Sequence, residues 1–224
     1  MGTVHQKPRQ QNFAFAQSKS EHRFSHGGIL FQRRSGRRAR PLSSREPLHL
    51  VFKARKERLK SGSLRSSQNF RLIHEILRKY AKKFFVKVEQ VSIQGDHLHL
   101  LIRTSRRSYF HFFFRVVAGQ IAQRFEQEGR LKAPPKNEES LKASANCERL
   151  SVPTIKSRAV IDTPAHGTRL WRYRPFSRVV RGWKAYKIVR DYIQLNEKEI
   201  LGEIPYRKER LKGLSSSDWQ ILWA

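Results

Sequence analysis

Two histidines separated by one hydrophobic residue are the side chains best suited to chemistry in this sequence. They form His97-Leu98-His99, at the start of a β-prone run that extends to Arg103. Because side chains alternate across a strand, His97 and His99 share one face and Leu98 points to the other. Neighbours on one face lie about 6.5 to 7 Å apart, so both imidazoles can converge on one cation. Neutral imidazole suits divalent metals, although two polar histidines facing solvent or a covering helix would give the same pattern.

A tyrosine and an asparagine form a second candidate pair further along the chain. Tyr192 and Asn196 lie four residues apart within Ala185 to Ile200, where the apolar spacing predicts a helix, so they share one side of it. A phenol is a weak nucleophile at neutral pH unless a metal, a base or nearby positive charge favours the phenolate. The alternatives are that Tyr192 packs in the core, that Tyr186 is the nucleophile, and that Asn196 is an ordinary exposed residue.

The composition indicates a polyanionic partner. Lys and Arg outnumber Asp and Glu by 47 to 18, which gives a formal net charge of +29. This excess is far beyond what solubility requires, so nucleic acid is the favoured partner. We find neither an apolar stretch near the roughly 20 residues that a membrane-spanning helix needs nor the pattern of a secretory signal, so we expect no membrane association and a cytoplasmic protein. A single cysteine, Cys147, excludes an intrachain disulfide and leaves His, carboxylate or amide groups as metal ligands.

The elements that must position these residues follow from hydrophobic periodicity. Period-two runs predict strands, and apolar residues at spacings of three and four predict helices. The predicted order is strand 48–52, helix from about 66 to 84, strands 86–94 and 97–103, helix 109–127, strand 170–180 and helix 185–200. The order βαββαβ is that of an α+β, ferredoxin-like fold, an antiparallel sheet with helices on one face, here followed by the helix that carries Tyr192.

The rest of the chain divides into segments by composition. Residues 1–45 mix Gln, Ser, Gly and Arg and predict a flexible basic arm, either a tether that contacts phosphates or a solvated tail. The main domain is expected over residues 46–212 and a tail over 213–224. Within the domain, residues 130–168 contain scattered Pro and Ser without a period, which indicates an inserted loop of low order.

At four places the sequence resembles the single-tyrosine HUH transposase family, which includes the REP-associated tyrosine transposases and insertion-sequence transposases. In that name, U denotes the hydrophobic residue between two metal-binding histidines. The matching segments are Pro47 to Phe52, Gly95 to Leu101, Leu170 to Phe176 and Val189 to Asn196, in the order of the family. They extend over much of the predicted domain.

The resemblance implies a specific reaction and a specific set of residues. Tyr192 would attack a phosphodiester of hairpin-bearing single-stranded DNA, leaving a 5′-phosphotyrosine and a free 3′-hydroxyl. His97 and His99 would hold Mg²⁺ or Mn²⁺. Asn196 would stand where such enzymes often supply a third ligand, although many relatives carry Gln there. The resemblance leaves open whether a homodimer forms, with Tyr192 acting in its own chain or in its partner.

Basic and aromatic residues before the last predicted helix are candidates for DNA binding. Guanidinium groups would contact the DNA backbone and aromatic rings would stack on unpaired bases, although we expect at least one of these rings to pack in the core. The candidates are Arg172, Arg174, Arg178, Arg181, Trp171, Tyr173 and also Trp183. Two alternative functions remain: a catalytically inactive or domesticated nucleic-acid-binding relative, and a relaxase or replication initiator of the wider HUH group.

Overall fold

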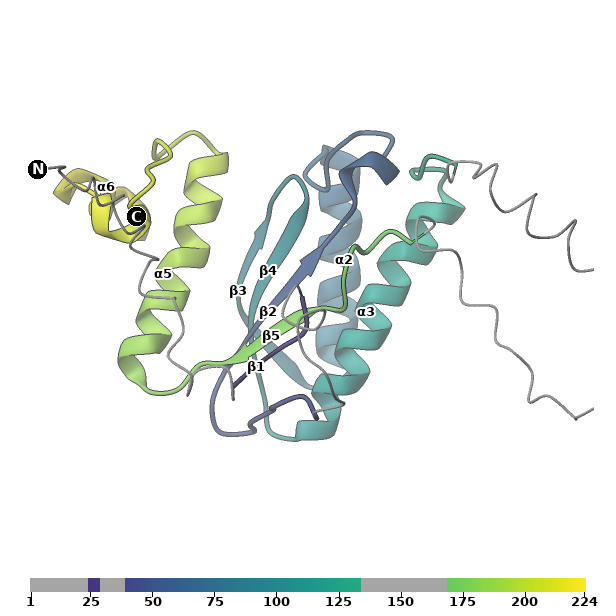
Figure 1. The fold of residues 1–224 in the computed structure, drawn as a ribbon, viewed down its shortest axis with the longest axis horizontal. Helices are drawn as coiled ribbons and strands as arrows, with labels where there is room; N and C mark the ends of the chain where they lie inside the picture. The colour runs from purple at the N-terminus through teal and green to yellow at the C-terminus, as the bar shows by residue number, and fades with distance from the viewer. Residues whose placement is uncertain (1–23, 29–38, 134–168) are drawn as a thin grey trace, which may run out of the picture.

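The computed structural model describes residues 24–28, 39–133 and 169–224. Within these ranges the chain forms one five-stranded antiparallel sheet in the order β1-β5-β2-β4-β3 (Figure 1). The strands are β1 (Ser25–His26), β2 (Leu48–Lys53), β3 (Val86–Ile93), β4 (His97–Thr104) and β5 (Phe176–Val179). The helices are α2 (Ser67–Lys83), α3 (Arg107–Gln127), α5 (Trp183–Ile200) and α6 (Ser216–Trp223), with short 3-10 turns η2 (Lys56–Arg58) and η3 (Arg210–Gly213).

The predicted ferredoxin-like α+β fold is confirmed. Strand β4 lies between β2 and β3 and is antiparallel to both, as in a split βαβ unit, and β5 pairs with the other side of β2. Helices α2 and α3 cover one face of the sheet, whereas α5 lies on the opposite face (Figure 1). The sheet therefore separates a hydrophobic core from the face on which α5 places its tyrosine.

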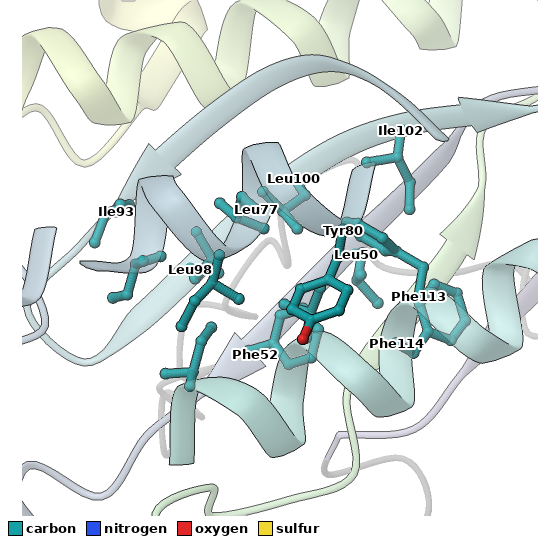
Figure 2. Packing of buried hydrophobic residues seen from close by; sticks show 14 of the residues in the cluster. Leu50, Phe52, Leu77, Tyr80, Ile93, Leu98, Leu100, Ile102, Phe113 and Phe114 are labelled. Carbon is teal, nitrogen blue, oxygen red and sulfur yellow. The ribbon is translucent and has the colours of Figure 1, made fainter. Parts of the chain in front are cut away.

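Side-chain alternation in β4 decides which residues enter the core. Leu98, Leu100 and Ile102 have no exposed surface and point toward α2 and α3, where aromatic side chains such as Phe113 meet them (Figure 2). Complete burial of one such aliphatic side chain contributes about 1.5 to 3 kcal/mol. His97 and His99, in the other phase of the strand, consequently face α5.

The core location of Leu100 gives a stability prediction. Leu100→Ala should lower the free energy of unfolding by about 2 to 5 kcal/mol, because it removes buried methyl groups and leaves a cavity. Urea unfolding followed by circular dichroism measures this loss. Leu201→Ala is the matched control, because Leu201 is 55% exposed and its truncation should change stability by no more than about 0.5 kcal/mol. Equal losses for the two variants would contradict the assignment of the core.

Strand β5 is shorter than predicted. The expected strand covered residues 170–180, but the ladder includes only Phe176–Val179. Pro175 has no N–H to donate to a ladder, and Trp171 before it forms only an isolated bridge with Ala54. The residues just before β5 therefore form a connection that contacts the chain at the end of β2, through the bridge of Trp171 with Ala54, before the strand begins.

Both ends of the predicted domain include more structure than expected. Ser25–His26, within the predicted arm, pairs with β5 at the edge of the sheet. Ser216–Trp223, within the predicted tail, is helix α6, which begins with a capping box between Ser215 and Asp218 and packs Leu222 onto α5. Residues 1–23 and 29–38 of the arm and residues 134–168 of the insertion lie outside the described residues, so their expected low order stays a prediction. Among the helices that the structure describes, none combines the length and the apolar character that crossing a membrane requires.

Candidate active site

The sheet face beneath α5 carries three neighbouring histidines among the described residues. His97 and His99 stand on β4, with ring centroids 4.7 Å apart and planes at 80°. His49 on β2 lies on the other side of His99, with ring centroids 5.3 Å apart and nearly parallel planes. The structure therefore brings together the two histidines that the sequence singled out and adds His49.

His49 and His99 form a hydrogen-bonded pair of neutral imidazoles. The His49 Nε2 and His99 Nδ1 atoms lie 3.1 Å apart, so one of them donates to the other. Burial, followed by the charge of Arg178, lowers the pKa of His49 to about 4. Burial, followed by the neighbouring histidines and Arg210, lowers the pKa of His99 well below its usual value. Both rings are therefore uncharged at neutral pH, which is the form that binds metals.

The remaining nitrogen of His99 is placed to bind a metal. His99 Nε2 is buried and has no hydrogen-bond partner among the described residues. When His99 donates from Nδ1 to His49, Nε2 presents a lone pair, as a metal-binding imidazole must. Metal-binding histidines usually have their second nitrogen fixed by a hydrogen bond, and His49 fits that position. A buried polar atom without a partner is costly, so a bound cation would satisfy it.

Asp96 fixes the second imidazole in the same way. Its carboxylate oxygen lies 2.6 Å from His97 Nδ1, which leaves Nε2 of His97 available. Burial raises the pKa of Asp96, but the hydrogen bond and the electrostatic interaction with His97, followed by the charges of Lys53 and Lys56, lower it overall. Asp96 is therefore an anionic acceptor that orients His97, as carboxylates do behind metal-binding histidines.

Helix α5 places Tyr192 against these histidines in the same chain. Val189 and Ile193 are buried over Leu101 of β4 and anchor the helix to the sheet. The ring of Tyr192 meets His99 edge to face, with centroids 5.8 Å apart and planes at 85°. The rings of Tyr192 and His99 are thus neighbours within one chain.

Tyr186, the rival nucleophile, lies in other surroundings. Its ring stacks on Trp183, with centroids 5.3 Å apart. Burial, together with the charge of Glu89 and a hydrogen bond to it, raises the pKa of Tyr186, which disfavours the phenolate. The geometry thus favours Tyr192 over Tyr186.

Asn196 is held by an arginine that the sequence analysis did not identify. Its side-chain oxygen accepts a hydrogen bond from Arg210 of η3, and its backbone oxygen accepts one from Gln94, at 2.8 Å. Arg210 also donates to both carboxylate oxygens of Glu199, each at 2.7 Å. The guanidinium carbon lies 5.3 Å from the centroid of the Tyr192 ring. Arg210 therefore links the tyrosine, the asparagine and an acidic residue of the same helix.

The residues present fit a divalent metal at two imidazoles. The rings of His97 and His99 lie next to each other on one face of the sheet, and each has one nitrogen in contact with a polar partner, Asp96 for His97 and His49 for His99. Asn196 fits less well, because its oxygen already faces the cationic Arg210, which would repel a metal ion. Among the described residues, no cluster of three His, Cys, Asp or Glu side chains could hold a metal. Asn196 as third ligand thus gains no support from the geometry.

The predicted DNA-binding residues lie in three different surroundings. Trp171 packs against Phe52, with ring centroids 5.3 Å apart, and its indole N–H donates to the carbonyl of Ala118, so it is structural. Arg178 stands directly opposite His49 across β5 and β2, on the histidine face. Arg172, Arg174 and Arg181 are exposed, and Tyr173 is half-buried beside Arg172.

Comparison with known families relates part of this chain to a transposase family. Residues 46–138 match the family model described as "Transposase IS200 like". This segment, from β2 to α3 and including both histidines of β4, is thus similar to IS200-like transposases. The match ends before α5, so the tyrosine helix is placed by the structure alone.

Two solved structures are similar to the chain. A REP-associated tyrosine transposase bound to a REP hairpin is 13% identical, with 76% of each chain covered and a TM-score of 0.47. A protein described as a transposase of Deinococcus radiodurans R1 is 15% identical, with 72% of this chain and 98% of that chain covered and a TM-score of 0.37. No curated protein matches the chain.

Proposed function

We propose that the protein is a DNA strand transferase that nicks and rejoins single-stranded, hairpin-associated DNA through a phosphotyrosine at Tyr192. One observation carries the proposal. The Tyr192 ring lies 5.8 Å from that of His99, whose buried Nε2 has no partner among the described residues, and His97 stands next to it. A nucleophilic tyrosine on a helix, next to two imidazoles that could bind a metal ion, could cleave and rejoin phosphodiester bonds.

The reaction conserves phosphodiester bonds. The Tyr192 oxygen attacks a DNA phosphorus, giving up its proton, while the bond from phosphorus to the 3′ oxygen breaks and that oxygen takes up a proton. One strand then carries a free 3′-hydroxyl, and the other is joined through its 5′-phosphate to Tyr192. A 3′-hydroxyl attacks this phosphotyrosine in the second step and restores the phenol, so no external energy source is needed.

The residues around Tyr192 each have a defined task in this scheme. His97 and His99 would hold Mg²⁺ or Mn²⁺, which when bound polarises the scissile phosphate and offsets its developing charge. His49 and Asp96 fix the two imidazoles. Arg178, on the same face, adds positive charge for the DNA backbone.

Labelling each DNA end separately tests the proposal. The full chain is incubated with Mn²⁺ and a hairpin-bearing single strand labelled at the 5′ or the 3′ end, then denatured and resolved by electrophoresis. A 5′-phosphotyrosine retains the segment downstream of the nick, so only the 3′ label should move with the protein. Retention of the 5′ label would contradict the polarity, and retention of neither would contradict the covalent intermediate.

A second candidate function is a noncatalytic DNA-binding protein, favoured by the contact between Asn196 and Arg210. Such a protein would bind DNA through charge and aromatic rings alone. Its affinity would not change with His97→Ala or with a chelator, and it would fall steeply with salt because counterions are released from the phosphates. Both candidate functions predict this salt dependence, so a covalent adduct that carries the 3′ label is the result that would exclude the noncatalytic one.

Arg210 gives a further prediction for the proposed reaction. Arg210→Lys keeps the charge but loses the fork that joins Asn196 and Glu199. Adduct formation should slow by up to about 100-fold, because displacement of reacting groups by about 1 Å costs that much. Single-turnover kinetics at saturating DNA measure the effect, and Lys212→Arg, an exposed change in the same turn, is the control. Faster adduct formation by Arg210→Lys would show instead that Arg210 restrains the nucleophile.

A further inference from the structure

An exposed aromatic pair lies at the first turn of α5, away from the histidines. Trp183 is 68% exposed, an unusual state for a large apolar ring, and it stacks on Tyr186 with planes at 20°. Gly182, at a φ of 77°, is the residue before the helix and brings the chain from β5 into this turn. The outer face of the indole ring is therefore presented to solvent with an aromatic ring beneath it.

The ring beneath Trp183 is connected to the sheet. Tyr186 is half-buried and its hydroxyl is hydrogen-bonded to Glu89 of β3. Glu89 also accepts from Arg103 of β4, at 3.1 Å. The ring under Trp183 is thus fixed to two strands of the sheet, so a planar group that stacks on the indole would meet a preformed surface with little entropy to lose.

The charge around the pair defines its ligand. Every charged residue from Arg169 to Arg190 is Arg or Lys, and Lys184 and Lys187 on α5 are exposed beside the rings. A flat aromatic surface flanked by exposed lysines matches an unpaired base with its phosphates, because every base has a face that can stack. Trp183 stands nine residues before Tyr192, about 13 Å along the helix axis, so a strand at the nucleophile could reach it.

We propose that Trp183 and Tyr186 form a stacking platform for an unpaired base of the single-stranded DNA that flanks the cleaved position. This inference rests on the proposed function for its ligand and assigns a site that lies outside the reacting groups. The structure favours this pair over Trp171, whose indole is committed to Phe52 and Ala118.

A comparison of DNA with and without bases tests the platform. Affinities of the full chain and of Trp183→Ala are measured by fluorescence anisotropy for oligo(dT) and for an abasic oligomer of equal length. Loss of one stacked base should weaken oligo(dT) binding by about 5- to 150-fold and leave abasic binding unchanged. Trp183→Phe should retain most of the affinity. Trp219→Ala, which removes an exposed tryptophan of α6, is the matched control and should affect neither oligomer.

Each other outcome overturns the platform. Equal weakening for both oligomers would show that Trp183→Ala disturbs phosphate contacts, and no weakening would show that no base stacks there. A shift from dimer to monomer in Trp183→Ala would assign the pair to a contact between copies of the chain. Adduct formation at Tyr192 is measured separately, so a platform without an adduct would overturn the proposed reaction, and an adduct without base-dependent binding would overturn the platform.

Discussion

Tyr192→Phe is expected to abolish the denaturation-resistant complex between protein and DNA. The substitution removes one oxygen and keeps the ring that meets His99, so the fold and the DNA affinity should stay close to those of the unmodified chain. Among the described tyrosines, Tyr192 is the one whose ring contacts these histidines. Electrophoresis after incubation with 3′-labelled hairpin DNA and Mn²⁺ measures the loss, which should be complete within detection.

Tyr186→Phe is the matched control for this prediction. Tyr186 lies on the same helix as Tyr192, and the substitution removes its hydroxyl, which interacts with Glu89 of β3. Adduct formation should stay intact, and stability should change only modestly. Wild-type labelling in Tyr192→Phe together with lost labelling in Tyr186→Phe would transfer the nucleophile to Tyr186. Equal labelling in both variants would contradict a nucleophilic tyrosine on α5.

Metal binding should depend on His97 and His99 and not on Asn196. His97→Ala removes a half-buried ligand with little risk to the fold, and His99→Ala removes the imidazole whose Nε2 has no partner among the described residues. Each should reduce Mn²⁺ binding below detection by electron paramagnetic resonance, and metal-dependent cleavage should fall with it. His49→Ala, which removes the support of a ligand, should lower metal affinity by about 10- to 100-fold.

Asn196→Ala distinguishes the two accounts of the metal site. If the amide oxygen is occupied by Arg210, the variant should retain Mn²⁺ affinity within about a factor of three, whereas loss of a ligand would reduce it far more. Retained Mn²⁺ binding in both His97→Ala and His99→Ala would contradict the metal site itself. Circular dichroism confirms that each variant is folded before titration.

The histidine face and the tyrosine helix followed from sequence because each depends on local periodicity. Alternation along His97–Thr104 sends Leu98 and Leu100 into the core, and the same alternation fixes His99 on the other face. The apolar spacing of α5 similarly predicted the side of the helix that carries Tyr192. Local patterns suffice where one element by itself decides the orientation of a side chain.

His49 and Arg210 could not be placed from local patterns. His49 alternates with buried Leu48 and Leu50, which signals a polar residue on the non-core face, but its contact with His99 depends on the register between β2 and β4. Arg210 lies in an irregular turn with a φ of 55°, and its approach to Tyr192 requires the chain after α5 to fold back. Such contacts are tertiary, and no period encodes them.

Capping and edge pairing explain the remaining differences. Ser215 and Asp218 carry the spacing of a capping box, a local signal that would have predicted α6 within the expected tail. The two-residue β1 has no such signal, because so short a strand is defined only by its pairing with β5. The partial burial of Trp171 likewise depends on a tertiary contact, its hydrogen bond to Ala118 of α3.

The most direct test of the central claim is the position of the DNA on the protein. After reaction with Mn²⁺ and hairpin-bearing single-stranded DNA, the adduct is digested with nuclease and protease and its peptides are sequenced by mass spectrometry. We expect a nucleotide joined through its 5′-phosphate to Tyr192 in the α5 peptide. A nucleotide on any other residue, or a 3′-phosphate linkage, would contradict the proposed reaction.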